Sequence, residues 1–476
     1  MKAGKLNIVR FIVLVFMLLA AVSCKKHKFP KSSAKEITSF VFWAIDNSTE
    51  INENIPGDII NDTIFVKINQ GINVGNFIPT IEYMGVAMSP ANETAQNFNN
   101  AVYYTVTAED GSTRRYVVKI VIQKANQKVY TASADGSVYA INVKKGTELW
   151  KYTTGGAIHS SPLLVGNTLY IGSMDKNLYA LDATTGALKW KYLTAAPIRQ
   201  ESPVISNGVV FISSANSYPD GTVYAIDAVS GTLKWSKTIV APTSPVVAGG
   251  KVFVNSKGAS FYALNETDGN VVWSTIFGLM SGHAAVVNDK LYIETSGSGS
   301  SYQLRCINAN NGSIFWNAPC LSYVTSPTID NGVAYVSTSV TIPQYVEAIN
   351  STDGSFKWRY THIHSGDINT PVTSCPFALD NLVFPGYHHG SFVALRTTNG
   401  TEAWQFSPAQ GAGWFSNPVA ANNMVYVGSS DNYLYALDMT GKMVWKFQTN
   451  GPIYSGACLI DYDNNIVHAG SSGAKN

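Results

Sequence analysis

The feature that most constrains the fold is a short motif that recurs eight times after residue 126. Each copy begins with a small residue, Ala in seven copies and Cys306 in the other. Each copy ends with a tryptophan: Trp150, Trp190, Trp235, Trp273, Trp316, Trp358, Trp404 and Trp445. Successive tryptophans are 38 to 46 residues apart, with β-rich segments between them. This period is typical of a four-stranded propeller blade, so the sequence predicts an all-β fold with an eight-bladed β-propeller over 126–476.

Each part of the motif has a structural reason. The small first residue allows neighbouring sheets to approach closely. An Asp or Asn two positions later, as in Asp182, hydrogen-bonds its own backbone and starts a turn. The glycine that follows, as in Gly186, adopts a positive φ at little steric cost. The tryptophan then packs against the neighbouring blade. The eight tryptophans are therefore predicted to be structural and are not candidate functional residues.

The two ends of the repeat region predict how the ring closes. The chain enters the propeller at Lys128 with no inner strand before it, and 456–461 forms an inner strand without a motif of its own. Joining these ends completes an eighth blade. The segment 465–468 is expected to compete with Val129-Tyr130 for the second position of that blade. A seven-bladed ring with loose ends is the alternative.

The motif also resembles a known family. Repeats of Ala-x-Asp-x-x-(Thr/Ser/Asn)-Gly-x-x-x-Trp resemble the tryptophan-docking propellers of the pyrroloquinoline-quinone (PQQ) repeat superfamily, over about residues 126–471. That superfamily includes quinoprotein dehydrogenases and the non-enzymatic propeller lipoprotein of the outer-membrane β-barrel assembly machinery. The dehydrogenases typically carry an adjacent Cys-Cys disulfide and a calcium site. This chain has no adjacent cysteine pair, so we expect neither PQQ nor another cofactor.

The first residues indicate export. Lys2, Lys5 and Arg10 precede the apolar run 11–22, and Ala21-Val22-Ser23-Cys24 resembles a bacterial lipobox. We expect a lipoprotein signal peptide at 1–23, lipidation of Cys24 and a tether over 24–34, so that the protein is anchored to the cell envelope, at the periplasmic or surface face of the outer membrane. An ordinary cleaved signal with an incidental cysteine is the alternative.

Residues 35–123 lack the tryptophan motif and contain alternating strands. The segment 64–68 is one of them, and 102–106 and 116–122 form a hairpin around Asp110-Gly111. About 90 residues of this kind predict a small immunoglobulin-like (Ig-like) sandwich. Its ends resemble an Ig-like domain at the front of many lipoproteins of Gram-negative bacteria, and we interpret it as a spacer or a presenting domain.

Candidate binding residues come from the predicted mouth of the propeller channel. Each inner strand is expected to follow an entrance residue: Pro162, Pro203, Pro245, Ala285, Pro327, Pro371, Pro418 or Ala457. The polar and aromatic residues just before these positions are His159, Arg199, Glu201, His283, Asn369, Trp414 and Tyr454. Such a set could bind a small polar or sugar-like ligand. The alternative is that these side chains solvate the mouth and satisfy strand ends.

Other chemistry has little support in the sequence. Charged residues make up 13% of the chain and the net charge is +2, with no basic-aromatic stretch, so we expect no nucleic-acid partner. Neither a nucleophile elbow, nor a P-loop, nor a metalloprotease motif is present, and no metal site is expected. Spacing leaves open whether Cys306 and Cys320 pair; buried single thiols are the alternative.

These observations favour a non-enzymatic, lipid-anchored envelope protein whose propeller is an interaction or assembly scaffold with an envelope protein partner. A binder of a small ligand or glycan at the channel mouth is the second hypothesis. A PQQ-dependent oxidoreductase is the third and is disfavoured by the missing cysteine pair.

Overall fold

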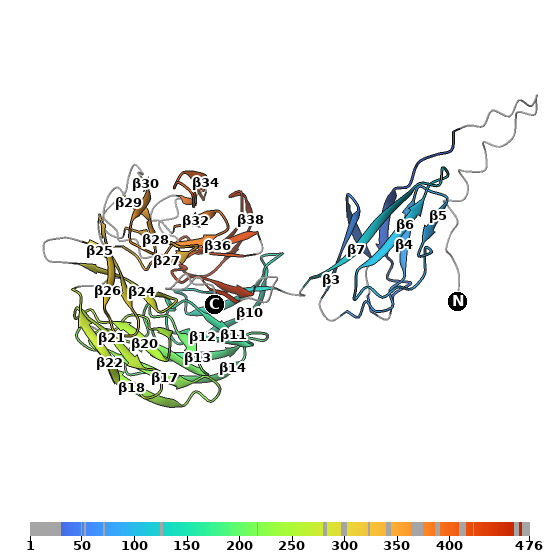
Figure 1. The fold of residues 1–476 in the computed structure, drawn as a ribbon. Coiled ribbons are helices and arrows are strands. Elements are labelled where there is room, and N and C mark those ends of the chain that lie inside the picture. Colours follow the sequence, from blue (N-terminus) through green and yellow to red (C-terminus); the bar gives the residue numbers. More distant parts are fainter. Residues whose placement is uncertain are drawn as a thin grey trace, which may run out of the picture. The chain divides into compact units, whose positions relative to one another are not determined.

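A computed structural model describes residues 30–48, 50–51, 54–69, 72–123, 127–216, 218–278, 283–296, 302–321, 324–338, 344–362, 375–385, 391–408, 416–421, 423–460 and 466–468. Its contacts divide the chain into two units, 1–125 and 126–476 (Figure 1). The predicted signal peptide and three candidate residues, Cys24, Asn369 and Trp414, lie outside the described residues. In the described part, no helix has the length and apolar character needed to cross a membrane.

The first unit consists of seven strands: β1 (Ile37–Phe42), β2 (Ile55–Ile60), β3 (Thr63–Asn69), β4 (Pro79–Tyr83), β5 (Ala87–Ser89), β6 (Val102–Thr107) and β7 (Thr113–Gln123). They pair in the order β4-β1-β2-β3-β7-β6-β5. The predicted hairpin is confirmed as β6 and β7, with Gly111 at φ 87° in the turn. Strands β3 and β7 run parallel, whereas their neighbours pair antiparallel.

Aromatic side chains fill the core of this unit. Phe40 and Phe42 of β1 are buried, and the Phe42 ring meets those of Phe77 and Phe98 edge to face at centroid distances of 4.9 Å. Tyr104 of β6 and Tyr116 of β7 are buried in the same core. The alternation of buried and exposed side chains along β6 and β7 therefore places one face of the hairpin in this core.

The second unit is a ring of eight sheets, which we number as blades in chain order. Blade 1 comprises β11 (Leu163–Val165), β12 (Thr168–Gly172), β13 (Asn177–Asp182) and β14 (Leu188–Leu193). Blade 2 comprises β15 (Val204–Ser206), β16 (Val209–Ser214), β17 (Thr222–Asp227) and β18 (Leu233–Thr238). Blade 3 comprises β19 (Val246–Ala248), β20 (Lys251–Asn255), β21 (Ser260–Asn265) and β22 (Val271–Ile276). Blade 4 comprises β23 (Ala285–Val287), β24 (Lys290–Ser296), β25 (Tyr302–Asn308) and β26 (Ile314–Cys320).

Blade 5 comprises β27 (Thr328–Asp330), β28 (Val333–Ser337), β29 (Gln344–Asn350) and β30 (Phe356–His362). Blade 6 comprises β31 (Phe377–Leu379), β32 (Leu382–Phe384), β33 (Phe392–Arg396) and β34 (Glu402–Phe406). Blade 7 comprises β35 (Val419–Ala421), β36 (Met424–Gly428), β37 (Tyr433–Asp438) and β38 (Met443–Gln448). The closing blade comprises β8 (Lys128–Ala132), β9 (Ser137–Asn142), β10 (Glu148–Thr153), β39 (Cys458–Ile460) and β40 (Ile466–His468). The predicted all-β, eight-bladed propeller is confirmed.

Within each blade the repeat motif spans the third and outer strands. The small residue and the tryptophan are cross-strand partners, as in Ala180 and Trp190 of blade 1, so a small side chain stands opposite each large ring. A register shift follows each such pair, here between Ala180 and Leu181. This β-bulge increases the local twist of the outer hairpin. The spacing of the motif thus encodes a bulged hairpin in every blade.

The closing blade joins the two ends of the ring. Strand β39 pairs with β8, with Cys458 opposite Tyr130, and thereby supplies the predicted inner strand. The expectation for 465–468 was wrong, because β40 pairs with the inner edge of β39 and contacts β11 and β35. Strand β8 is already bonded to β9 and β39, so the free edge of β39 is the one left for β40. The closing blade therefore has a fifth strand toward the ring axis.

The structure also corrects two entrance positions. The residue directly before the inner strand is Ala284 in blade 4 and Pro376 in blade 6, in place of Ala285 and Pro371. The Asn-Thr-Pro sequence at 369–371 matches the expected pattern but lies upstream of the strand entrance at Phe377. The assignment of Asn369 to the mouth rested on Pro371 and loses that basis.

Candidate functional site

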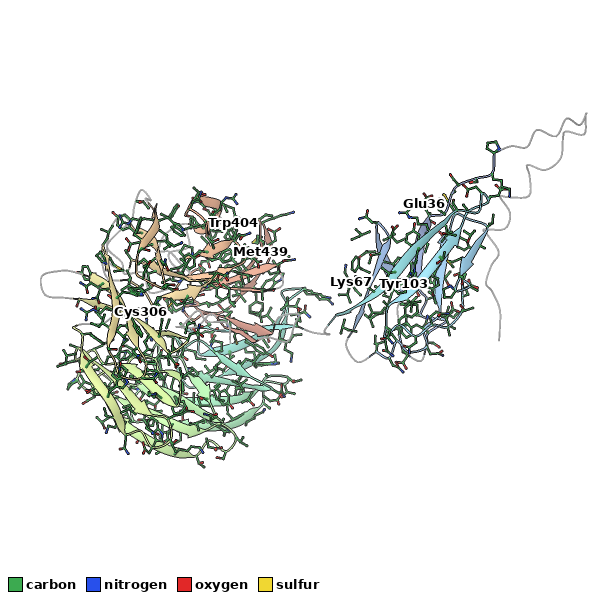
Figure 2. The ribbon with its side chains drawn as sticks, in the orientation of Figure 1. Glu36, Lys67, Tyr103, Cys306, Trp404 and Met439 are labelled. Carbon is green, nitrogen blue, oxygen red and sulfur yellow. The ribbon has the colours of Figure 1, made fainter. Side chains whose placement is uncertain are left out.

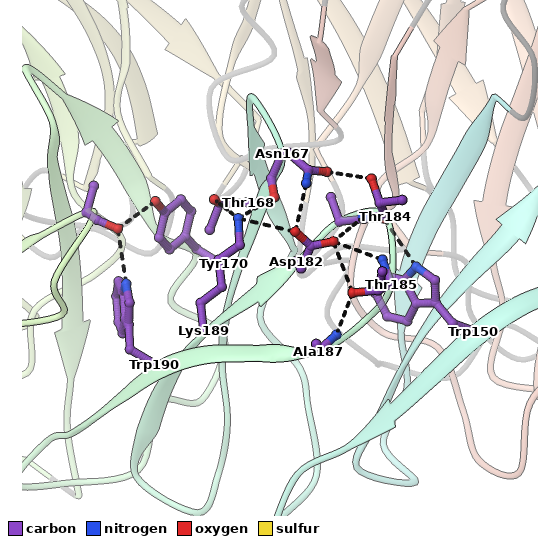
Figure 3. Close-up of polar contacts among 12 residues, drawn as sticks. Trp150, Asn167, Thr168, Tyr170, Asp182, Thr184, Thr185, Ala187, Lys189 and Trp190 are labelled. Carbon is purple, nitrogen blue, oxygen red and sulfur yellow. Dashed lines mark hydrogen bonds and ion pairs between the residues drawn. The ribbon is translucent and has the colours of Figure 1, made fainter.

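The eight motif tryptophans dock onto the next blade. Each indole Nε1–H donates to a backbone carbonyl at the third-strand turn of that blade, over distances of 2.7 to 3.3 Å. Figure 3 shows this for Trp150 and Trp190, and Figure 2 shows Trp404 beside Met439, whose carbonyl it reaches. Trp445 donates to the carbonyl of Val143 and so links blade 7 to the closing blade. The docking therefore runs around the whole ring.

The motif glycines allow the rings to lie flat on these turns. A Cβ at Gly186 would lie 2.7 Å from Cε3 of Trp150, and Gly186 has φ 76°. The same close approach recurs at the other seven motif glycines. Each glycine is required for two reasons, a left-handed backbone and the absence of a side chain under the tryptophan. These residues hold the blades together and lie away from the channel mouth.

A second set of hydrogen bonds links blade to blade at the channel mouth, and we call it the mouth belt. In six of the eight blades, the side chain of the residue before the entrance position accepts an N–H from the preceding blade. The acceptors are Ser161 (from Gly456), Ser202 (from Ser161), Ser244 (from Ser202), His283 (from Ser244), Ser326 (from His283) and Asn417 (from Cys375). The distances are 2.7 to 3.1 Å. The belt satisfies backbone groups that would otherwise be left unpaired where the inner strands begin.

One position earlier, hydroxyl side chains serve their own blade. The hydroxyl oxygens of Ser160, Thr325 and Ser416 accept the N–H of Gly172, Ser337 and Gly428, each at the end of the second strand. Ser455 donates to the carbonyl of Ala132. At these positions the structure favours the alternative interpretation, in which mouth side chains satisfy strand ends.

His283 has a structural role in the mouth belt. Its Nδ1 accepts the N–H of Ser244 at 3.1 Å, and its own N–H donates to Oγ of Ser326 at 2.7 Å. Because Nδ1 is an acceptor, the neutral ring carries its proton on Nε2. Burial lowers the pKa of His283 to about 4, and the charge of Lys257 acts in the same direction. His283 is therefore a neutral histidine where most other blades have a serine.

We expect the His283→Ser variant to be as stable as the wild type near pH 7 and less sensitive to acid. A pKa lowered from 6.5 to about 4 means that the unfolded chain binds the proton first. In the wild type, the contribution of His283 to the free energy of unfolding is therefore fully present above pH 6.5. It decreases as the pH falls toward 4, by at most about 3 kcal/mol. Urea unfolding between pH 7 and pH 4 measures this. His283→Ala is the matched control. It leaves the Ser244 N–H without an acceptor, which should lower the free energy of unfolding by about 1–3 kcal/mol. An unchanged acid dependence in His283→Ser would contradict the assignment.

Glu201 departs from the hydroxyl pattern. It occupies the position of Ser160 and Thr325, and its Oε2 accepts the N–H of Arg199 at 2.8 Å. Burial raises the pKa of Glu201, and the charges of Lys257 and Arg199 oppose that rise. The guanidinium of Arg199 is exposed and donates from Nη2 to the carbonyl of Asn216 at 3.0 Å. These two predicted residues lie together at the entrance to blade 2.

Lys257 was missed by the sequence analysis. It lies in the β20–β21 turn, where its N–H donates to the carbonyl of Ala241, beside the entrance to blade 3. The equivalent turns have Asp135, Asp175 and Asp431, each accepting a tyrosine hydroxyl at 2.5 to 2.6 Å, whereas this turn has Gly258 at the aspartate position. The replacement of the repeated aspartate by glycine is the signal in the sequence that could have identified the turn that contains Lys257.

His159 and Tyr454 form an aromatic pair at the entrances to blade 1 and the closing blade. Their rings lie 5.2 Å apart at an interplanar angle of 78°. Burial lowers the pKa of His159, and the positive charge of Arg199 lowers it further, which places the two side chains within electrostatic reach. Tyr454 remains 36% exposed. The mouth therefore has an aromatic surface next to Arg199.

The described residues do not fit the cofactor of quinoprotein enzymes. Cys306, Cys320, Cys375 and Cys458 are free thiols, three of them buried. Cys306 pairs across the sheet with Trp316 and Cys320 with Tyr302, so no disulfide joins them. Over the residues that the structure describes, no group of three or more His, Cys, Asp and Glu side chains could hold a metal ion.

Comparisons with known proteins give the family of the propeller and a match for the first unit. The family described as "SGBP, N-terminal" matches 45–120. The relative named "Outer membrane protein assembly factor BamB" from Moranella endobia is 25% identical over 261 residues, 47% of this chain and 63% of that protein. The chain thus spans less than two thirds of the length of this relative, and the same holds for that of Yersinia pestis.

Two further similarities are to proteins with other names than BamB. "Tetrathionate hydrolase" of Acidithiobacillus ferrooxidans is 24% identical over 376 residues, 74% of this chain and 71% of that protein. The solved structure "Dihydro-heme d1 dehydrogenase NirN in complex with DHE" has a TM-score of 0.55 at 13% identity and covers 70% of this chain and 74% of its own. A likeness at that identity concerns the fold alone.

The PQQ-repeat family described as "Outer membrane protein assembly factor BamB" matches four overlapping segments, 119–212, 194–298, 277–413 and 376–474. These segments span the whole propeller, and the expected PQQ-like superfamily is confirmed. Because they cover most of the chain, the protein belongs to this PQQ-repeat family of BamB-type propellers.

Proposed function

We propose that this chain is a non-enzymatic cell-envelope protein whose propeller is a rigid scaffold for a protein partner. The observation that carries the proposal is the docking of every motif tryptophan on the next blade, with Trp445 on Val143 completing the circle. A ring fixed at each blade junction presents its loops in constant positions. Loops held on a rigid framework are the usual location of binding surfaces. Membership of the BamB-type family supports the same function.

The contact surface is proposed to lie on the mouth face, where the repeats differ from one another. On the opposite face the turns follow one pattern and are bonded internally, as in Asn167 Nδ2 donating to Asp182 and Thr184 Oγ1 donating to Asn167 (Figure 3). On the mouth face one turn has Asp175 and another has Lys257, and the connections between blades differ in length. Variable loops can specify a partner, whereas uniform turns maintain the ring.

The remaining parts of the chain suit a tethered scaffold. We propose that Cys24 carries the lipid, that 24–34 is the tether and that the first unit is an Ig-like spacer. The strands of that unit, which are antiparallel except for the β3–β7 pair, and its aromatic core support the last point. The match to an N-terminal domain family over 45–120 supports a separate module ahead of the propeller. Replacing Cys24 with Ser should release the protein from the membrane fraction.

In-cell crosslinking followed by purification from membranes tests the scaffold. We expect one defined envelope protein to be recovered with the full-length chain. The Cys24→Ser variant should recover less of that partner, because it is no longer concentrated at the membrane. Recovery of a monomer without any partner, at expression levels that yield the protein itself, would contradict the proposal.

A further inference from the structure

One side of the channel mouth has two exposed cations, Arg199 and Lys257, and a half-buried carboxyl group, that of Glu201. Among the described residues, neither Arg199 nor Lys257 forms an ion pair, although both are exposed. The nearby turn aspartates are engaged, since Asp135 and Asp175 each accept a tyrosine hydroxyl. Glu201 accepts the N–H of Arg199, and the mouth-belt bond from Ser202 to Ser244 joins this entrance to that of blade 3, where the N–H of Lys257 bonds the carbonyl of Ala241. The two cations therefore come from neighbouring entrances, and guanidinium and ammonium groups are common partners of oxyanions.

Next to these cations lies an aromatic surface suited to a sugar. The ring of Tyr454 is partly exposed and is held edge to face by His159. The mouth-belt bond from Ser161 to Ser202 joins the entrance that carries His159 to the entrance that carries Arg199, so the aromatic pair and the cations lie at neighbouring entrances. An aromatic face binds the C–H surface of a sugar ring, while the neutral imidazole of His159 and the Glu201 carboxyl can hydrogen-bond its hydroxyls.

Two observations concern the position that Glu201 occupies in blade 2 and Thr243 in blade 3. Glu201 occupies a position where hydroxyl groups serve the strand ends in other blades, and in the described part of the chain only backbone N–H groups hydrogen-bond to it. In blade 3 the equivalent residue, Thr243, is 5% exposed, and its hydroxyl is buried and has no hydrogen-bond partner among the described residues. A buried polar group without a partner has an unmet hydrogen bond that a ligand or water can supply.

From this arrangement we propose that the mouth binds an acidic saccharide. Arg199 and Lys257 bind its carboxylate, Tyr454 stacks on its ring, and Glu201 and His159 hydrogen-bond its hydroxyls. This ligand site goes beyond the scaffold function and does not depend on it.

Calorimetric titration of the full-length protein with trigalacturonate tests the proposal. We expect micromolar to low-millimolar binding that weakens at least tenfold in the double variant Arg199→Gln/Lys257→Gln and in Tyr454→Ala. Lys234→Gln, on outer strand β18 and paired with Asp227, is the matched control and should bind as the wild type does. Unchanged melting temperatures exclude misfolding as the reason for a loss.

Two further probes separate the parts of the proposal. Neutral trigalactose should bind at least tenfold more weakly than trigalacturonate, and so should citrate, which has carboxylates and no sugar ring. Equal binding of trigalactose would overturn the role of the cations, and equal binding of citrate would overturn the saccharide assignment. No binding of trigalacturonate, or binding unaffected by the double variant, would overturn the site itself.

Discussion

Ending the chain at Tyr454 should unfold the propeller, whereas ending it at Ile460 should leave a folded ring. The shorter chain loses β39, whose Cys458 is buried opposite Tyr130 of β8. It also loses the Gly456 N–H that Ser161 accepts and the Ser455 hydroxyl that bonds the carbonyl of Ala132. Strand β8 would be left with an open inner edge in the centre of the ring. We expect the free energy of unfolding of the shorter chain to fall by about 5 kcal/mol or more, because an entire buried strand and its backbone hydrogen bonds are removed.

The chain that ends at Ile460 is the matched control. It keeps β39 and loses β40, which pairs with β39 alone. Urea unfolding followed by tryptophan fluorescence should show a cooperative transition for this control and none, or a transition at much lower urea, for the shorter chain. Equal stability of the two chains would contradict closure by β39 and would favour the seven-bladed alternative.

Replacing Gly354 with Ala should destabilise the propeller far more than the same change at Gly332. Both glycines lie in turns of blade 5, at φ 77° and 76°. Around Gly332 no atom lies within 4 Å of the new Cβ, so only backbone strain of about 1 kcal/mol is expected. At Gly354 the new Cβ would lie 2.7 Å from Cε3 of Trp316. Trp316 must then move off the turn and lose its hydrogen bond to the carbonyl of Ser351. We therefore expect Gly354→Ala to lower the free energy of unfolding by about 3 kcal/mol or more in total.

The difference between these two variants isolates the docking contact from the conformational preference of glycine. Chemical unfolding of both variants under the same conditions gives that difference directly. A red shift of tryptophan emission in Gly354→Ala alone would show that an indole has become solvated. Equal losses in the two variants would contradict tryptophan docking as the link between blades.

The sequence was most informative where structure repeats. The pairing of Ala180 with Trp190 and the approach of Gly186 to Trp150 recur in each blade, so eight copies of one motif predicted the blade count and the closing blade. The predicted hairpin of the first unit followed from alternation around Gly111 in the same way. Local patterns succeed here because each contact depends on residues at a fixed spacing.

The remaining features depend on contacts that no fixed spacing encodes. The position of β40 depends on which strand edge is free once the ring has closed. The entrance of blade 6 lies at Pro376, and not at the nearby Pro371, because β31 begins where it can pair with β32. From the sequence, His283 was predicted to line the mouth. Its bond to the Ser244 N–H joins two blades, and no spacing within one blade predicts such a bond. Lys257 is different, because the replacement of the repeated aspartate by Gly258 can be found by aligning its turn with those of Asp135 and Asp175.

We propose that the mouth face of the rigid ring binds an envelope protein. Site-specific photo-crosslinking in cells, with the probe at exposed turn positions of each face, is the most direct test of this proposal. Lys176 and Asn216 are such positions on the mouth face, and Thr184 and Val229 are their counterparts on the opposite face. We expect one crosslinked partner from Lys176 and Asn216 and none from Thr184 and Val229. Crosslinks only from the opposite face, or from no position at all, would contradict it.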